Sequence, residues 1–336
     1  MPPTVSLIVP CYNERATIRF LLEAIYAQTY PRAEMEVIIA DGLSEDGTRE
    51  EIAAFQQEHP DLNLRVVDNP ARIIPAGLNR AIEAARGEFI IRLDAHSGPH
   101  PDYVERCVEA LRAGRGENVG GVWEIRPGGT GWVAEAIAVA AAHPLGVGDA
   151  LYRHATRAAL VDTVPFGAFR RTLIEEIGMF DETLLTNEDY EFNARLRLAG
   201  GRIYLDPAIR SIYFARPDLR ALAKQYWRYG YWKWRMLRRY PKTLRWRQAL
   251  PPLFVLSLLL GAVTAPWVTP LRLLFALEVA LYAWILFAVG AREAMRRRRP
   301  SLALGLPLAI ATMHLSWGSG FLWSVLSALF SPQNHG

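Results

Sequence analysis

The amino-acid sequence predicts an α/β domain with a doubly wound sheet, followed by a region of membrane helices. In the first hundred residues, short β-rich runs alternate with segments of helical periodicity, as in a mainly parallel sheet that is covered by helices. From about Leu250 onward the chain is mostly apolar, whereas the first two-thirds mixes apolar and charged residues as a globular enzyme does.

Each element of the sheet region is predicted from its local pattern. Strands are expected where short apolar runs are rich in β-branched residues, at 5–9, 35–40, 64–67 and 89–93. Helices are expected between them, at 16–28, from 48 onward and at 76–86. Residues 114–206 are less regular, with a strand at 120–125 and a helix at 188–199. Open α/β sheets bind ligands beyond the carboxyl ends of their strands, so the functional groups are expected there.

The charge distribution and the cysteine content indicate what kind of partner the protein binds and in which compartment it resides. Between Arg216 and Arg247 there are eleven Lys and Arg and one acid, Asp218, which predicts an anionic partner. The segment is rich in Tyr and Trp and precedes the apolar region, so it favours membrane lipids over nucleic acid. The only cysteines, Cys11 and Cys107, give no disulfide framework and suit a reducing compartment.

The apolar region predicts about three transmembrane helices, at 250–267, 271–291 and 302–330, the last kinked or tilted by its glycines and proline. Basic residues before the first span and at 292–299 place these segments on the cytoplasmic side. No signal-peptide pattern begins the chain, so the first domain is expected in the cytosol. The prediction is a multi-pass protein of the cytoplasmic (inner) membrane, divided into 1–215, an interfacial segment 216–248 and a membrane domain 249–331.

Two ionisable residues fall inside the predicted spans. Glu278 lies in the second span and His314 in the third. Such groups are costly in a bilayer and usually have a partner. We therefore expect them to pack against each other or against Arg272 rather than to act in catalysis.

Acidic residues follow three of the predicted strands. Glu14 follows the first strand, Asp41 the second, and Asp94 with His96 the fourth. Asp41-Gly42 alone would be read as a common turn, and Glu14 alone as a residue that stabilises a helix start. Together they predict a site at one edge of the sheet. If the strand continues through Asp94 and His96, these two side chains share a face and are expected to bind a divalent cation that also holds a diphosphate. The imidazole favours Mn²⁺ over Mg²⁺ and leaves both open.

Two further groups have both a structural and a functional interpretation. Glu188 and Asp189 open a helix, where acids favour the helix dipole, but Asp189 could also act as a general base. Gln225 and Arg228 lie in the basic segment. They would be solvated residues of an interfacial helix, or Arg228 would hold a donor or acceptor phosphate.

These motifs resemble the inverting family-two glycosyltransferases with the GT-A fold, over residues 4–215. Pro10, Tyr12 and Glu14 match the opening motif that contacts the nucleoside, and Asp41 matches the aspartate that binds the base, usually uracil. The resemblance implies a nucleotide-sugar donor that these residues bind together with Asp94. Asp94-Ala95-His96 occupies the position of the metal motif Asp-x-Asp. Glu188-Asp189 occupies the Glu-Asp position, whose aspartate is the family's base.

The sequence departs from the family pattern at two places. His96 replaces the second metal-binding acid, and Gln225-Tyr226-Trp227-Arg228-Tyr229 replaces the Gln-x-x-Arg-Trp of processive synthases. These departures, and the small number of predicted transmembrane helices, favour a non-processive enzyme similar to the succinoglycan-type glucosyltransferases. That resemblance implies transfer of glucose from UDP-glucose, with inversion, onto a polyprenyl-diphosphate-linked sugar in exopolysaccharide or other surface-glycan assembly.

Other functions stay open on the sequence alone. Polyprenyl phosphate itself could be the acceptor, which would make the protein a polyprenyl-phosphate sugar synthase. A membrane scaffold with a degenerate nucleotide pocket is the alternative without enzymatic activity. A dinucleotide-dependent dehydrogenase is disfavoured, because residues 10–15 contain no glycine where the phosphate-binding turn would need them.

Overall fold

The structure is a computed structural model that describes residues 3–241 and 246–330. The chain divides into two compact units. The first contains the residues up to Glu124 and Ala150–Tyr213, and the second contains Ile125–Asp149 and the residues from Phe214 onward. Residues 242–245 of the predicted interfacial segment, and residue 331 at the end of the predicted membrane domain, lie outside the described residues.

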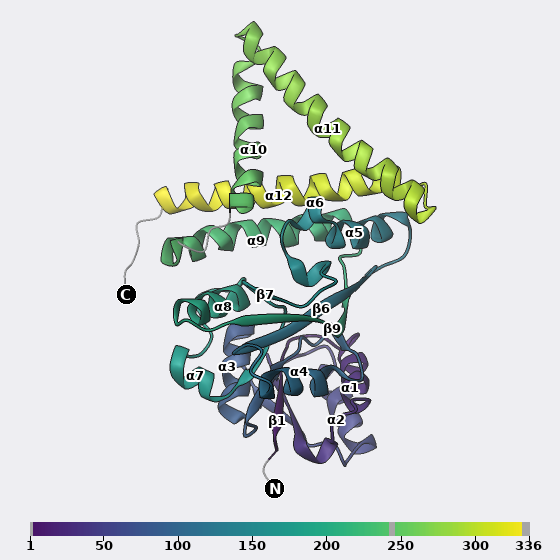
Figure 1. Cartoon of the computed structure of the whole chain (residues 1–336), viewed down its shortest axis with the longest axis vertical. Helices are drawn as coiled ribbons and strands as arrows, with labels where there is room; N and C mark the ends of the chain where they lie inside the picture. The colour runs from purple at the N-terminus through teal and green to yellow at the C-terminus, as the bar shows by residue number, and fades with distance from the viewer. Residues whose placement is uncertain (1–2, 242–245, 331–336) are drawn as a thin grey trace. The chain divides into compact units, whose positions relative to one another are not determined.

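A nine-stranded mixed sheet forms the centre of the first unit (Figure 1). Its order is β3-β2-β1-β4-β8-β6-β9-β5, and β7 also pairs with β9. The neighbours β3, β2, β1 and β4 are parallel, whereas β8 runs antiparallel to β4. The strands are β1 Val5–Cys11, β2 Met35–Asp41, β3 Leu64–Asp68, β4 Phe89–Arg92, β5 Gly98–Pro99, β6 Asn118–Arg126, β7 Ala159–Val161, β8 Ala168–Arg170 and β9 Ile203–Phe214.

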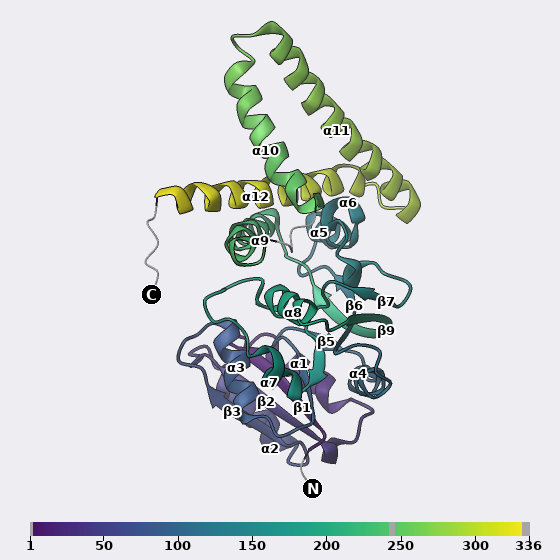
Figure 2. The same cartoon turned by 60° about the vertical axis from the view of Figure 1, so that its left-hand side comes forward.

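Helices cover both faces of this sheet (Figure 2). On one face, apolar residues of β1 and β2 form a core with α1 Ile18–Tyr26, α2 Thr48–Glu58 and α4 Tyr103–Arg112. On the other face, a second core contains α3 Ile74–Ala84, α7 Thr172–Ile177 and α8 Glu188–Leu198. Strands buried on both faces are apolar throughout, which is why the short apolar runs located them correctly. The predicted α/β fold is confirmed.

The parallel register brings the predicted strand ends to one edge. Cys11 pairs with Asp41 at the ends of β1 and β2, and Ile8 pairs with Arg92 at the end of β4. Because β4 ends at Arg92, the strand geometry does not continue through the Asp94-Ala95-His96 motif. Instead the Ser97 amide donates to the Asp94 carbonyl at 2.9 Å, which closes a turn. The expectation that Asp94 and His96 share one strand face is therefore wrong.

Helices make up the second unit. Helix α12 packs along α9 and also contacts α5, α10 and α11. The α9–α12 contact is close because both helices carry a glycine there: a Cβ at Gly230 would collide with the Trp317 carbonyl, and one at Gly320 with the Trp227 carbonyl. The helices are α5 Trp132–Ala142, α6 Pro144–Val147, α9 Leu219–Arg239, α10 Trp246–Thr264, α11 Thr269–Arg297 and α12 Leu302–Phe330.

Two of the described helices, α11 and α12, are long and apolar enough to cross a membrane. The segment predicted as the first span forms α10, whose apolar part, Gln248–Thr264, is shorter. In the most apolar window of α11 only 11% is buried, against 44% in α12. Helix α12 runs unbroken through Pro307, so the proline does not interrupt it. The number of crossings stays a prediction.

The two ionisable residues of the apolar region have other partners than expected. The Ser257 hydroxyl on α10 donates to Glu278 on α11 at 2.5 Å. His314 on α12 lies 3.1 Å from the Tyr282 hydroxyl and 2.9 Å from the Leu145 carbonyl. The expected pairing of Glu278 and His314 with each other or with Arg272 is therefore wrong: Glu278 accepts from a hydroxyl group, and His314 contacts a hydroxyl group and a backbone carbonyl.

Candidate active site

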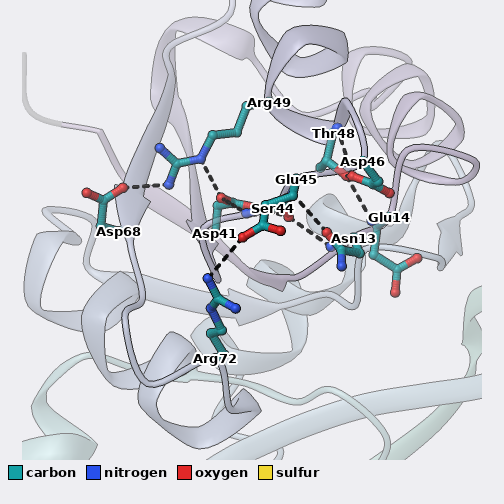
Figure 3. Close-up of polar contacts among 10 residues, drawn as sticks. All are labelled: Asn13, Glu14, Asp41, Ser44, Glu45, Asp46, Thr48, Arg49, Asp68 and Arg72. Atoms are coloured by element: carbon teal, nitrogen blue, oxygen red, sulfur yellow. Dashed lines mark hydrogen bonds and ion pairs between the residues drawn. The ribbon is translucent and has the colours of Figure 1, made fainter.

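The loops that follow β1 and β2 are joined by hydrogen bonds (Figure 3). The Asn13 amide donates to the Ser44 hydroxyl at 2.8 Å, and the Glu45 amide donates back to the Asn13 side chain at 3.0 Å. The Glu14 amide donates to the Thr48 hydroxyl at 2.9 Å. Asn13 has a φ of 54°, a left-handed conformation that Asn tolerates better than most residues. The two loops therefore form one fixed wall of the site.

Asp41 is buried beneath this wall. Its carboxylate has no solvent exposure and accepts hydrogen bonds from the Ser44 amide at 3.0 Å and the Ser44 hydroxyl at 2.5 Å. The Arg49 guanidinium pairs with Asp41 through Nε and with Asp68 through Nη2 (Figure 3). Asp41 therefore orders the loop after β2, and its carboxylate is already occupied.

Tyr12 presents an open aromatic surface beside the wall, with 42% of the residue exposed. The guanidinium carbon of Arg72 lies 5.5 Å from the centroid of the Tyr12 ring, and Arg72 also reaches Glu45 at 3.4 Å. Pro10 lies against α3, since a Cβ at Gly77 would be 3.3 Å from the Pro10 Cβ. An exposed ring with a charged neighbour is suited to stacking on a planar base.

Arg92 connects two groups of predicted site residues that are far apart in sequence. It is 4% exposed, and its Nη2 atom donates to Asp94 Oδ1 at 3.1 Å and to Glu188 Oε1 at 2.9 Å. The end of β4 is thereby joined to the first turn of α8. The sequence analysis missed Arg92, although a charged residue inside the apolar run Phe-Ile-Ile-Arg-Leu was a signal that it is buried for a reason.

The acids at the start of α8 are held in an environment that favours their protonated forms. Burial raises the pKa of Glu188, and the neighbouring charges of Asp189 and Asp94 raise it further, against the opposing effect of Arg92. Burial likewise raises the pKa of Asp189, with a contribution from Asp94. Asn187, before the helix, has a φ of 69°. A carboxylate with a raised pKa is a stronger base than an exposed one, as proton abstraction requires.

Glu14 lies against the metal motif. Its Oε1 atom is 3.1 Å from Nδ1 of His96, and its Oε2 atom accepts from the Thr17 hydroxyl at 2.5 Å. Burial opposes the charge of Glu14, but the hydrogen bonds from His96 and Thr17 outweigh it and lower the pKa of Glu14. Three predicted site residues, Glu14, Asp94 and His96, are thus gathered between the ends of β1 and β4.

Comparison with known proteins shows the family to which the chain belongs. The family described as Glycosyl transferase family 2 matches residues 6–178. The chain belongs to glycosyltransferase family 2. The succinoglycan biosynthesis protein ExoA of Rhizobium meliloti (strain 1021) is 32% identical over 323 residues, which cover 95% of this chain and 94% of that protein. The predicted resemblance to the family and to its succinoglycan type is confirmed.

Two other proteins are similar to this glycosyltransferase over most of its length. A dolichyl N-acetyl-alpha-D-glucosaminyl phosphate 3-beta-D-2,3-diacetamido-2,3-dideoxy-beta-D-glucuronosyltransferase of Methanococcus voltae is 28% identical, covering 94% of this chain and 95% of that protein. The solved structure of the mannosyltransferase PcManGT from Pyrobaculum calidifontis, in complex with GDP-Man and Mn²⁺, has a TM-score of 0.57 at 25% identity. It covers 93% of this chain and 87% of that one, and supports the GT-A fold.

The side chains around Asp94 could supply only some of the ligands of a metal ion. Among the described residues there is no cluster of three or more His, Cys, Asp and Glu side chains that could hold a metal ion. Asp94 uses Oδ1 for Arg92, and its Oδ2 has no hydrogen bond to any described residue. A divalent cation bound beside Asp94 would therefore take most of its ligands from phosphate oxygens and water.

The predicted phosphate contacts Gln225 and Arg228 lie on α9, in the second unit. The Gln225 side chain donates to the Tyr229 hydroxyl at 2.8 Å, one turn further along the helix. Aromatic and basic residues alternate around this helix, which suits a membrane interface.

Proposed function

We propose that this glycosyltransferase is an inverting, metal-dependent hexosyltransferase that extends a lipid-linked sugar. The observation that carries the proposal is the buried Arg92, which holds Asp94 of the metal motif and Glu188 of the base motif in one cluster. An enzyme that transfers a sugar in one displacement needs a group at the leaving diphosphate and a base at the acceptor hydroxyl, and this cluster supplies both.

In the proposed reaction, Asp189 takes the proton of the acceptor hydroxyl. The acceptor oxygen forms a bond to the anomeric carbon as the bond from that carbon to the diphosphate oxygen breaks, so the anomeric centre inverts. A divalent cation, Mn²⁺ or Mg²⁺, held by Asp94 and His96 would stabilise the charge on the departing nucleoside diphosphate. Tyr12 and Pro10 form the nucleoside side of the site, with the loop that Asp41 orders.

The substrates are proposed from the relatives. UDP-glucose is the proposed donor, on the similarity to the succinoglycan biosynthesis protein. A polyprenyl-diphosphate-linked sugar is the proposed acceptor, and the name of the methanococcal relative, which contains a dolichyl phosphate-linked sugar, supports a lipid carrier. Arg228 and Gln225, on the basic aromatic helix α9, would bind the carrier's phosphates.

The second unit supports a location in the membrane. Helices α11 and α12 are apolar enough to cross a bilayer, and α11 is largely uncovered. The Arg-rich end of α11 supports a cytosolic location for that end, because basic residues are more frequent on the cytosolic side of membrane proteins. We propose a multi-pass protein of the cytoplasmic membrane whose catalytic unit lies in the cytosol, where nucleotide sugars are made.

The test is the variant Asp189→Asn, purified in detergent and compared with Glu175→Gln, an exposed acid on α7. We expect Asp189→Asn to bind UDP normally and to lose transfer by about 10²–10⁴-fold, the usual contribution of a general base. Glu175→Gln should transfer as the unchanged protein does. Near-normal transfer by Asp189→Asn would remove the proposed base.

The acceptor is tested in the same assay. Polyprenyl diphosphate carrying one sugar, and polyprenyl phosphate without a sugar, are supplied separately with UDP-glucose. Product from the first alone supports the proposal, whereas product from polyprenyl phosphate alone would make the protein a polyprenyl-phosphate sugar synthase. No transfer or donor hydrolysis with any nucleotide sugar would favour the membrane scaffold.

A further inference from the structure

Arg92 is the charged residue on which the cluster of acids depends. Its guanidinium is buried and donates hydrogen bonds to Asp94 and to Glu188, the residue next to Asp189 at the start of α8. One buried guanidinium group therefore faces three carboxylates, one from the loop after β4 and two from the start of α8. Without it, the like charges would repel one another and Asp94 and the start of α8 would move apart.

The hydrogen bonding of Arg92 points to a role beyond support of the fold. Its Nε and Nη2 atoms both donate to Asp94 Oδ1, at 3.3 and 3.1 Å, and Nη2 is shared with Glu188. The Nη1 atom is buried and has no hydrogen-bond partner among the described residues. A purely structural arginine would be expected to satisfy all its buried donors. Here two carboxylates share one nitrogen, which fixes their separation.

We propose that Arg92 is a positioning residue that sets the placement of the cation-binding Asp94 relative to the acid pair Glu188 and Asp189. The inference rests on the proposed function, because it assigns Asp94 to the leaving group and Asp189 to the acceptor. Because Arg92 occupies Oδ1 of Asp94, the Oδ2 atom would be left to hold a cation. Because the same nitrogen also holds Glu188, Arg92 fixes the separation between Asp94 and the start of α8, where Asp189 lies.

Charge and position make opposite predictions for the removal of Arg92. If Arg92 acted only through its charge, removing its positive charge from beside Asp94 would raise the affinity for Mn²⁺. If it positions Asp94, removing it lets the carboxylates separate, and the affinity falls. Residues that orient a metal ligand typically contribute about 10–100-fold to metal affinity or activity.

The experiment compares Arg92→Met and Arg92→Lys with matched variants of Arg195, in the full chain in detergent. Arg195 also pairs with a buried acid, Glu191, but along α8 itself. Binding of Mn²⁺ in the presence of UDP is measured by the electron paramagnetic resonance signal of free Mn²⁺. The kcat for glucose transfer is then measured at saturating Mn²⁺ and UDP-glucose.

For Arg92→Met we expect Mn²⁺ affinity to fall about tenfold or more, and kcat at saturating Mn²⁺ to fall at least as far. Arg92→Lys should recover part of the Mn²⁺ affinity but little of kcat, because an ammonium group cannot present the planar fork that holds two carboxylates. The Arg195 variants should bind Mn²⁺ as the unchanged protein does, even where thermal stability falls.

Several results would overturn the inference. These are an unchanged or raised Mn²⁺ affinity in Arg92→Met, a kcat that saturating Mn²⁺ restores fully, or equal losses in the Arg92 and Arg195 variants. Failure of the proposed function would look different. The unchanged protein would then bind Mn²⁺ with UDP but transfer no sugar, and the Mn²⁺ measurements would still decide whether Arg92 positions Asp94.

Discussion

The Nδ1 atom of His96 lies 3.1 Å from the Oε1 atom of Glu14. An ionised carboxylate only accepts hydrogen bonds, so this contact favours the form of His96 in which Nδ1 carries the proton. The lone pair that a cation would use is then on Nε2. This is the usual arrangement by which a carboxylate orients a metal-binding histidine.

The first prediction concerns Glu14→Gln. Because the amide no longer fixes the ring proton on Nδ1, we expect the affinity for Mn²⁺ in the presence of UDP to fall about tenfold, within the range for such partners. The nitrogen coupling that bound imidazole gives in pulsed electron paramagnetic resonance should weaken as well. Glu23→Gln, on the exposed side of α1, is the control and should leave both unchanged. Unchanged Mn²⁺ binding in Glu14→Gln would show that Glu14 does not orient His96 for the metal ion.

The second prediction concerns how Asp41 affects nucleotide binding. Its carboxylate is fully buried and is occupied by Ser44 and Arg49, so we expect it to act by ordering the loop rather than by direct contact with the base. Asp41→Asn and Arg49→Met should then weaken UDP and GDP binding by similar factors, measured by calorimetry. A loss confined to UDP in Asp41→Asn, with Arg49→Met unaffected, would instead show that Asp41 reads the base directly.

Much of the site could be predicted because parallel strands bring their ends to one edge whatever the side chains are. Glu14, Asp94 and His96 were placed together correctly for that reason. The relation between Asp94 and His96 was not, because where β4 stops depends on the turn that Ser97 closes. Arg92 was missed because its buried ion pair with Glu188 joins segments that are far apart in the sequence and leaves no periodic pattern there.

In the helical unit, the sequence located the apolar segments but not their packing. Gly320 was taken only as one of the residues that would kink or tilt the third span, whereas in the structure Gly320 and Gly230 each allow the backbone of α9 to approach that of α12. Composition specifies that a helix is apolar, but not whether its neighbour is lipid or another helix. The predicted partners of Glu278 and His314 were wrong because they too depend on which helices are neighbours.

The third prediction concerns the contact between α9 and α12. A leucine at Gly320 would collide with the Trp227 carbonyl, so Gly320→Leu should force the two helices apart. Overpacking of this kind typically costs about 1–3 kcal/mol. We expect a lower thermal unfolding temperature in detergent and faster proteolysis within α9. Ser319→Leu, at the adjacent exposed position, adds the same side chain without the collision and should behave as the unchanged protein. Equal behaviour of the two variants would exclude close packing at Gly320.

The fourth prediction concerns the orientation of the membrane segment. Trp267, between α10 and α11, is 86% exposed, and Arg298 follows α11. If α10 and α11 cross the bilayer with the catalytic unit in the cytosol, these positions lie on opposite sides. Cysteine at each position reports on this, because the native Cys11 and Cys107 are both buried. In intact spheroplasts, a membrane-impermeant maleimide should label Trp267→Cys and should label Arg298→Cys only after permeabilisation. Labelling of both positions from the same side would mean that the α10–α11 pair does not cross the membrane.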